Sequence, residues 1–502
     1  MQTDAIKHVV IAGSDAPAWL TALILLRALG QNRDQTGLTV EVVEIRSALR
    51  PADVTVTLPS LRAFHRMLGL DQAELIAATD ATYSLGQRYA GFVGSRPAYL
   101  ATYATAGVPQ HNLGFLQFWL RARHEGLKIE LDEFSLGAAA ARVGRYAPPP
   151  PSAAGLDAAE HGFHMHTLSY VRWLRAHALQ RGVKVTPGAA FEVMTGEAGI
   201  AGLKLTDGRV IEGDIYIDAT GTEAKLISAL DNSRDEAAHL PGDRLLVTAA
   251  APLSPLPLHA QISAHRHGWL GLYPLRSQTG MVMGYDSTAF SDDEALQQIA
   301  TLSGLKPASG AVAEVYRPGR LRRAWVQNTI AVGPAAAVLE PNDGLDLHMV
   351  QVALSHLVSL FPLSRLRMPE ADLFNDYLAS YYDRALDYQA TRYHLNRRFG
   401  EPLWDRLRDV PVTETVRHRI DLFRRRGLVA LYEHEATNED GWVAHLLGMG
   451  IVPEDYDPQV DQAPEGEVIQ RFQGILKYVA DRVRQMPTHE ELLARAAGKV
   501  GA

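Results

Sequence analysis

Apolar and polar positions follow a regular order over the first 44 residues of the chain. Residues 7–13 (KHVVIAG) form an apolar, β-branched run of the kind found in buried strands. Residues 19–29 carry apolar side chains at helical spacing, and residues 38–44 (LTVEVVE) form a second apolar run that ends at Glu44. This pattern predicts a strand, a tight turn, a helix and a second strand, which is the order of a dinucleotide-binding βαβ unit.

The turn before the helix departs from the glycine pattern of such units. Of G-x-G-x-x-G, only the first glycine is present, at Gly13, while Asp15 and Ala18 occupy the second and third positions. A carboxylate about 5 Å from a pyrophosphate charge would be repelled by roughly 3 kcal/mol at an effective dielectric near 20. Alternatively, Asp15 is the N-cap of a helix with Pro17 in its first turn. The residues expected to bind a dinucleotide here are Gly13, Ser14, Ala16, Ala18 and Glu44.

The middle of the chain continues the pattern of an α/β protein. Residues 81–89 predict a strand, residues 108–123 a helix, and the proline-rich run 145–155 an extended linker. Short apolar runs between residues 183 and 212 predict a small antiparallel sheet with a hairpin turn at Asp207-Gly208.

Two further buried strands end at glycine. Residues 214–221 (DIYIDATG) end in D-x-T-G, and residues 329–333 (TIAVG) lead into a predicted helix start at Pro334. This order predicts an α/β fold of the FAD-dependent monooxygenase type, a Rossmann-type βαββ sheet with an inserted antiparallel sheet. Later helical patterns cover residues 348–361, 373–394, 413–425 and 467–486. We expect a flavin-binding module over residues 1–346 and a helical region over residues 347–502 that covers the substrate side, although the spacing of its aromatic residues is more typical of core packing.

Composition narrows the class of protein. The chain has 502 residues, 47% of them hydrophobic, and a net charge of -8, which argues against a nucleic-acid surface. It has no cysteine, which excludes disulfides, iron–sulfur clusters and cysteine nucleophiles. His164 and His166 alternate on one predicted strand without a nearby acid, so we expect no metal site. No signal peptide or membrane-spanning apolar run is present, which predicts a soluble, cytoplasmic protein without a membrane partner.

Motifs over nearly the whole chain resemble the flavin-dependent halogenase family, in its tryptophan-halogenase branch. The matching segments, in chain order, include 58–61 (LPSL), 81–83 (ATY), 144–147 (GRYA), 218–221 (DATG), 268–269 (GW), 339–341 (LEP), 448–451 (GMGI) and 456–458 (YDP). The resemblance implies FAD, reduced by a separate flavin reductase, and an aromatic substrate that is a small molecule or part of a peptide. It also allows a homodimer. The cofactor residues that it adds are Asp218, Gly221, Gly333, Pro341, Gly344 and Leu345, and its substrate-channel residues are Trp269, Tyr273, Pro274 and Glu340.

The positions that carry chemistry in this family are altered here. In the family, an oxidant made from halide at the flavin crosses a tunnel to a lysine in the pattern A-[ST]-Y-K, and this position is Ser84. The assisting glutamate of E-P-L-E-S-T-S corresponds to Asp343, and the next residue is Gly344. Halide in the family lies against the backbone after that position, where Asp346 would oppose an anion.

Two further family patterns are changed. G-E-A-T-x-P beside the flavin corresponds to residues 54–59 (VTVTLP), and W-x-W-x-I-P retains Trp269 but has Gly271 and Tyr273 further along. Together these changes predict a retained fold in which halogenation and halide binding are lost or altered. Three functions stay open: a halogenase for an indole or phenol, a flavin monooxygenase that hydroxylates, and a degenerate paralogue that acts as a binding or partner subunit.

Overall fold

The computed structural model describes residues 4–30, 37–110, 112–150, 152–188 and 190–498. The chain forms two compact units, each made of three segments. The first unit comprises Met1–Thr79, Met165–Ala238 and Arg317–Leu386, and the second comprises Asp80–His164, His239–Tyr316 and Asp387–Ala502. The expected division after residue 346 stays a prediction.

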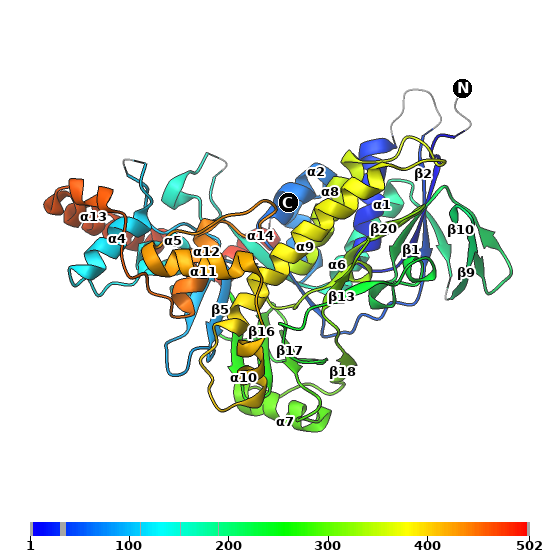
Figure 1. The fold of residues 1–502 in the computed structure, drawn as a ribbon. Helices are drawn as coiled ribbons and strands as arrows, with labels where there is room; N and C mark the ends of the chain where they lie inside the picture. The colour runs from blue at the N-terminus through cyan, green and yellow to red at the C-terminus, as the bar shows by residue number, and fades with distance from the viewer. Residues whose placement is uncertain (1–3, 31–36, 111, 151, 189, 499–502) are drawn as a thin grey trace. The chain divides into compact units, whose positions relative to one another are not determined.

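The first unit is built on a six-stranded, mainly parallel sheet (Figure 1). Its strand order is β20 (Trp325–Val326), β21 (Thr329–Ala331), β12 (Ile215–Ala219), β1 (His8–Gly13), β2 (Thr39–Glu44) and β8 (Lys184–Pro187). β1 lies parallel to both β2 and β12, with Gly13 opposite Ala219. The predicted βαβ unit and the return of the D-x-T-G strand to β1 are therefore confirmed.

Helices and smaller sheets surround this sheet in the first unit. α1 (Ala16–Leu29) packs against β1 and β2 and against α6 (Thr167–Gln180) and α8 (Leu345–Ser359). The remaining elements are β3 (Val54–Val56), α2 (Ser60–Leu68), α3 (Gln72–Ala78), β9 (Phe191–Gly196), β10 (Gly199–Leu205), β11 (Val210–Ile211), η3 (Gly221–Glu223), η4 (Ile227–Ala229), β13 (Arg234–Glu236), β19 (Gly319–Leu321), η5 (Gly333–Ala335) and β22 (Ala337–Val338). Apolar residues of β1, β2 and β12 share a buried core with β10.

Two predictions for the first unit need correction. The predicted antiparallel sheet contains only β9, β10 and β11, because β8 pairs in parallel with β2 at the edge of the main sheet. The hairpin turn is confirmed, since Gly208 has a φ of +87° and its N–H donates to the Leu205 carbonyl. The helix expected at Pro334 is only the short η5, and α8 begins later, after Gly344, because the chain first forms β22.

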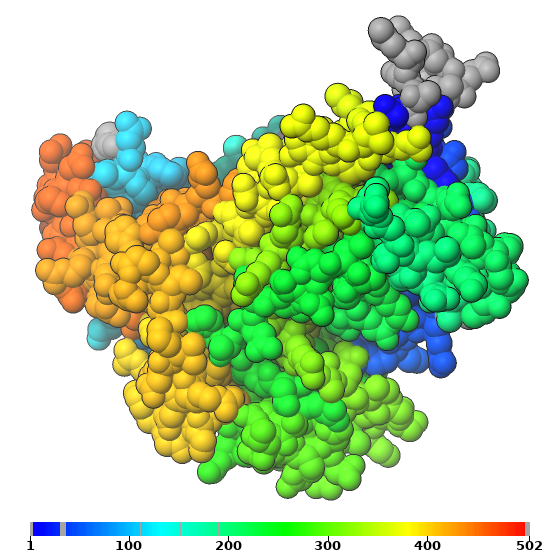
Figure 2. Space-filling view, turned by 45° about the vertical axis from the view of Figure 1, so that its right-hand side comes forward, coloured from blue at the N-terminus to red at the C-terminus, as the bar shows by residue number. Residues whose placement is uncertain are grey.

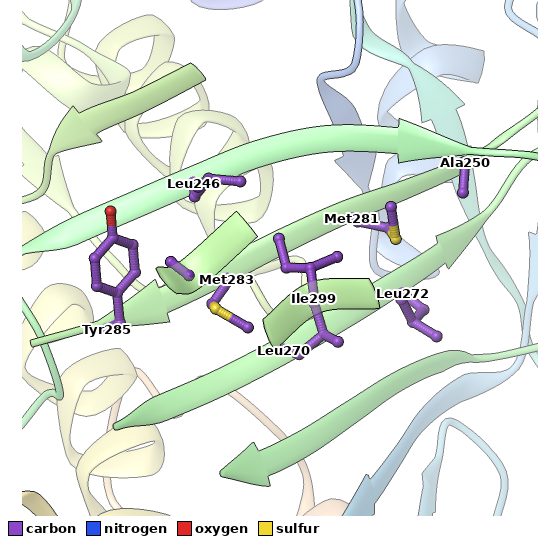
Figure 3. Packing of buried hydrophobic residues seen from close by; sticks show 9 residues of the cluster. Leu246, Ala250, Leu270, Leu272, Met281, Met283, Tyr285 and Ile299 are labelled. Carbon is purple, nitrogen blue, oxygen red and sulfur yellow. The ribbon is translucent and has the colours of Figure 1, made fainter. Parts of the chain in front are cut away.

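The second unit is built on a seven-stranded sheet. Its strand order is β18 (Val312–Val315), β14 (Arg244–Ala250), β17 (Thr279–Tyr285), β16 (Gly268–Pro274), β15 (Ala260–His265), β5 (Gly86–Ala90) and β6 (Tyr99–Thr102). One face carries a buried cluster in which side chains of β14, β16 and β17 pack against Ala295 and Ile299 of α7 (Asp292–Ser303) (Figure 3).

Helices form much of the rest of the second unit. They are α4 (Phe115–His124), η1 (Leu131–Phe134), α5 (Leu136–Val143), η2 (Gly155–Asp157), α10 (Pro402–Asp409), α11 (Glu414–Arg426), α12 (Glu439–Gly448), η6 (Pro458–Gln462), α13 (Glu465–Gln485) and α14 (His489–Gly498). α9 (Glu370–His394) carries the chain from the first unit into the second, and β4 (Thr82–Ser84) pairs with β7 (Gly162–His166). In the space-filling view, the red α13 lies beside the cyan segment that contains α4 (Figure 2).

The helical C-terminal pattern is confirmed, whereas two earlier predictions are partly wrong. The strand predicted over residues 81–89 is broken at Leu85, whose N–H donates to the Leu258 carbonyl. The helix predicted from residue 108 begins at Phe115, because Pro109 and a turn closed between Gln110 and Leu113 precede it. The C-terminal aromatic residues Tyr382, Tyr388, Tyr393, Trp404 and Trp442 are buried.

The described residues contain neither a membrane-spanning helix nor a cluster of metal ligands. No helix among them has the length and apolar character needed to cross a bilayer. No group of three or more histidine and acidic side chains among them could hold a metal ion. His164 is fully buried, which lowers its pKa to about 3, and His166 is the N-cap of α6, where its ring accepts from Ser169 N–H.

Candidate functional site

The turn after β1 is shaped by the close approach of β12. A Cβ atom at Gly13 would lie 2.5 Å from the Ala219 carbonyl oxygen, so only glycine fits where these two strands end together. Ser14 then donates its hydroxyl to the Ile45 carbonyl at 2.5 Å, which ties the turn to the chain after β2. Gly13 and Ser14 thus hold the strand ends at which a dinucleotide binds in such folds.

Asp15 stands at the N-cap position of α1 without capping it. Its side chain forms no capping hydrogen bond, and its Oδ1 accepts from the Ser47 hydroxyl at 2.6 Å. Burial raises the pKa of the Asp15 carboxyl, while the Ser47 hydrogen bond acts in the opposite direction. The alternative prediction is therefore right about position and about Pro17 but wrong about capping. The carboxyl is turned toward Ser47 instead of the first turn of the helix.

Glu44 ends β2 as predicted, and its carboxylate forms an ion pair with an arginine of α6. Arg175 donates from Nε and an Nη to the two carboxylate oxygens, at 2.6 and 3.1 Å. Such a bidentate pair fixes the carboxylate plane. The oxygens keep further lone pairs that could accept from a ribose hydroxyl.

Asp218 is the acidic residue of D-x-T-G, and its carboxylate accepts hydrogen bonds from the loop that follows it. It is fully buried and accepts hydrogen bonds from the Thr220 N–H and hydroxyl and from the N–H groups of Leu226 and Ile227, at 2.7–3.0 Å. Burial raises its pKa, and these hydrogen bonds counteract the rise. Asp218 therefore holds the loop after β12 in place, and a direct contact with cofactor stays a prediction.

The turn before α8 gathers buried polar residues. Asn342 donates to Glu340 Oε2 at 2.8 Å, and Leu345 N–H donates to Asp343 Oδ1 at 3.2 Å. Gly344 has a φ of +85°, and a Cβ there would lie 3.3 Å from the Val56 side chain. The altered segment at residues 54–57 thus lies directly against the altered turn.

Asp346 occupies an open recess of the first unit. Its side chain is exposed to solvent, but protein atoms around the carboxyl remove part of its hydration. Together with the charges of Asp343 and Glu340, this loss of hydration holds the pKa of the carboxyl well above its usual range. Beside it is a cavity of about 20 Å³, into which Tyr382 also faces. The buried Tyr382 hydroxyl has no hydrogen-bond partner among the described residues. Acidic groups, not cations, therefore dominate the start of α8.

In the second unit, Ser84 is fully buried at the end of β4. Its hydroxyl donates to the Gly86 carbonyl at 3.3 Å, and its register partner on β7 is Gly162. Two positions earlier, the Thr82 hydroxyl donates to the Pro274 carbonyl at 2.6 Å. This bond joins the strand of Ser84 to the end of β16, where the predicted channel residues lie.

Trp269 and Tyr273 are fully buried on β16, and Tyr273 takes space that the family pattern gives to a second tryptophan. A Cβ at Gly271 would lie 2.6 Å from the Tyr273 hydroxyl and 2.8 Å from its ring. The ring of Tyr273 also meets His164 edge-on, with 6.1 Å between centroids. The loss of one aromatic residue is thus offset by another on the same strand.

The sequence did not indicate a cavity of about 300 Å³ in the second unit. Tyr99, Trp119, Leu447 and Asp440 are among its lining residues, which come from β6, α4, η1, α5 and α12. Thr102 also lines it and pairs in register with Gly86, two residues after Ser84. Gly448 is the residue of the lining whose type reflects this packing, because a Cβ there would overlap the Tyr99 ring.

Together the parallel sheet, the Gly13 turn and the returning β12 define a Rossmann-type FAD-binding fold. The tryptophan halogenase family model matches residues 8–465, and the chain belongs to this family. Relatives include tryptophan 7-halogenase KtzQ of Kutzneria sp. (strain 744), which is 25% identical over 99% of both chains.

Solved structures agree with this family. BrvH, a flavin-dependent halogenase from Brevundimonas sp. BAL3, is 28% identical with a TM-score of 0.91, covering 98% of this chain and 99% of that one. Xcc4156, a flavin-dependent halogenase from Xanthomonas campestris, is 28% identical with a TM-score of 0.92, covering 98% of each chain. The predicted family and fold are therefore confirmed.

Proposed function

We propose that this chain is an FAD-binding oxidoreductase that acts on an aromatic substrate and does not halogenate through the family's lysine. The observation that carries the proposal is the position of Ser84. Ser84 lies two residues before Gly86, whose register partner Thr102 lines the cavity of about 300 Å³. That volume is within the range of sites for small organic ligands.

The residues of the first unit fit a bound adenine dinucleotide. Gly13 lets β1 and β12 end side by side, Asp15 is turned toward Ser47, and Glu44 is held by Arg175, where its oxygens could accept from a ribose. The N-terminus of α1 would face the pyrophosphate. Reduced FAD from a separate reductase would supply the electrons that activate oxygen.

Two features argue against halogenation by the family route. A serine cannot form the haloamine that an amine forms, and the Ser84 hydroxyl is already engaged by Gly86. The carboxylate of Asp343, which accepts from Leu345 N–H, would also repel a halide at the start of α8. Hydroxylation of the aromatic ring is the oxidative reaction that needs neither group.

A direct test begins with binding and then examines products. The purified protein would be titrated with FAD, and with reduced FAD under anaerobic conditions, by flavin fluorescence and calorimetry. We expect saturable binding of at least one form. The protein would then be supplied with a flavin reductase, oxygen, bromide and indole or phenol. Hydroxylated product without bromide supports the proposal, and a brominated product overturns its second part.

A second candidate function is a degenerate paralogue that serves as a binding or partner subunit. The observation that favours it is the pair of carboxyls at Asp15, which stands at the second glycine position of the turn after β1, and at Asp346, which lies in the first turn of α8. No binding of either flavin form at concentrations well above those in cells would favour this candidate over the first.

A further inference from the structure

Glu44 lies beside the turn that follows β1. Ser14 of that turn donates its hydroxyl to the Ile45 carbonyl, and Ser47 donates its hydroxyl to Asp15, so two hydrogen bonds join the turn to the segment after β2. Glu44 is the last residue of β2 and directly precedes Ile45. Its side chain therefore starts at the strand ends where the proposed function places a dinucleotide.

Arg175 of α6 restrains the Glu44 carboxylate. Its guanidinium donates from Nε to Oε1 at 2.6 Å and from an Nη to Oε2 at 3.1 Å. A bidentate pair of this kind fixes both the position and the plane of the carboxylate. Since each carboxylate oxygen has two acceptor sites, the pair leaves one site on each oxygen for a ligand. Glu44 can thus accept from two hydroxyl groups at once.

The guanidinium of Arg175 is itself held against Trp19. Its central carbon lies 5.6 Å from the centre of the Trp19 ring, which is within the range of a cation–π contact. Trp19 is fully buried on α1 and donates its indole N–H to the Ser14 carbonyl at 2.8 Å. The same tryptophan therefore supports Arg175 and the turn after β1, and so links the Glu44 carboxylate to that turn.

The ion pair of Arg175 and Glu44 provides orientation rather than stability. The two side chains are 40% and 22% exposed, and exposed ion pairs contribute little to the free energy of unfolding. The arginine also neutralises a carboxylate that would otherwise repel an anionic ligand at the N-terminus of α1. The two open acceptor sites match the neighbouring 2′- and 3′-hydroxyls of a ribose.

We propose that Arg175 is a positioning residue of the dinucleotide site, which orients Glu44 so that its carboxylate selects a ribose with both hydroxyls free. This rests on the proposed function and deepens it, because it names the residue that sets the selectivity of the site for the adenosine half of FAD. A 2′-deoxyribose would lose one hydrogen bond to Glu44, and a 2′-phosphate would bring an anion against the carboxylate.

The test compares the affinity of the full chain for FAD and for the FAD analogue that contains 2′-deoxyadenosine, both by fluorescence titration. We expect FAD to bind about tenfold tighter, which corresponds to one hydrogen bond to a charged group. Equal affinities for the two ligands would overturn this proposal and leave flavin binding intact. Binding of neither ligand would overturn this proposal together with the proposed function.

Three variants assign the selectivity to Arg175. Arg175→Gln should abolish the preference for FAD over the analogue and leave the urea unfolding midpoint nearly unchanged, because the ion pair is exposed. Arg175→Lys keeps the charge without the bidentate geometry, so it should retain only part of the preference. The matched control is Arg172→Gln, which removes the same charge at an exposed position of the same helix and should behave as the wild type. An Arg175→Gln protein that keeps the full preference, or an Arg172→Gln protein that loses it equally, would refute the assignment.

Discussion

At the scale of single residues, Gly271 and Tyr273 act as a pair. They stand two positions apart on β16, so their side-chain positions face the same side of the sheet. The Tyr273 ring fills the space above Gly271, where the family pattern has its second tryptophan. A large aromatic group is therefore present on this face, but it is anchored two residues further along the strand.

This pairing predicts strong coupling between the two positions. Gly271→Trp should destabilise the second unit by about 3 kcal/mol, because the new ring has no room beside Tyr273. The double variant Gly271→Trp with Tyr273→Ile should recover most of that loss, since the isoleucine vacates the space. Urea unfolding of both, with Tyr273→Ile alone as control, measures the coupling free energy. Additive effects would mean that the two side chains do not compete for the same volume.

At the scale of elements, the turn between β1 and α1 combines a fitting backbone with a misfitting charge. Gly13 and Pro17 suit the strand end and the first helical turn, whereas Asp15 brings a carboxyl to the position of the second glycine. The Ser47 hydroxyl holds that carboxyl away from a capping position. Removal of the carboxyl should therefore improve anion binding at this helix end.

Asp15→Gly should tighten FAD binding about tenfold, because it removes a like charge near the expected pyrophosphate. Asp71→Ala is the matched control, since Asp71 is in the same unit and does cap its helix, α3, by accepting from Ala73 and Glu74 N–H. That change should lower stability by about 1 kcal/mol and leave flavin affinity unchanged. Fluorescence titration with FAD measures the flavin affinity of both variants. Unchanged affinity in Asp15→Gly would place Asp15 away from the dinucleotide.

Elements with strong local patterns were predictable, and contacts between distant segments were not. The β1–α1–β2 unit, the β12 return and helices α9, α11 and α13 follow from apolar periodicity, which is a local property. The pairing of β8 with β2 and the delay of α8 until Leu345 depend on tertiary packing. The 300 Å³ cavity joins segments far apart in sequence, so apolar periodicity does not indicate it.

At the scale of the whole molecule, changes at the family's chemical positions fall in both units. Ser84 lies in the second unit, and Asp343 and Asp346 lie in the first. The two groups of changes concern different parts of the reaction, since a lysine serves the substrate side and the α8 start serves halide. We therefore expect the reversal of one change to leave the effect of the other in place.

Ser84→Lys alone should give no brominated product, even though burial at this position would lower the pKa of the lysine and favour the neutral amine. The triple variant Ser84→Lys, Asp343→Glu and Asp346→Ser restores the family residue at all three positions. With FAD, a flavin reductase, oxygen and bromide, we expect it to give brominated indole, detected by mass spectrometry, under conditions in which Ser84→Lys gives none. Ser84→Met, which has similar length and no charge, is the control. Bromination by Ser84→Lys alone would show that the carboxyls of the first unit do not exclude halide. A triple variant that binds FAD without brominating would indicate that the changes at residues 54–57, which lie against Gly344, also prevent bromination.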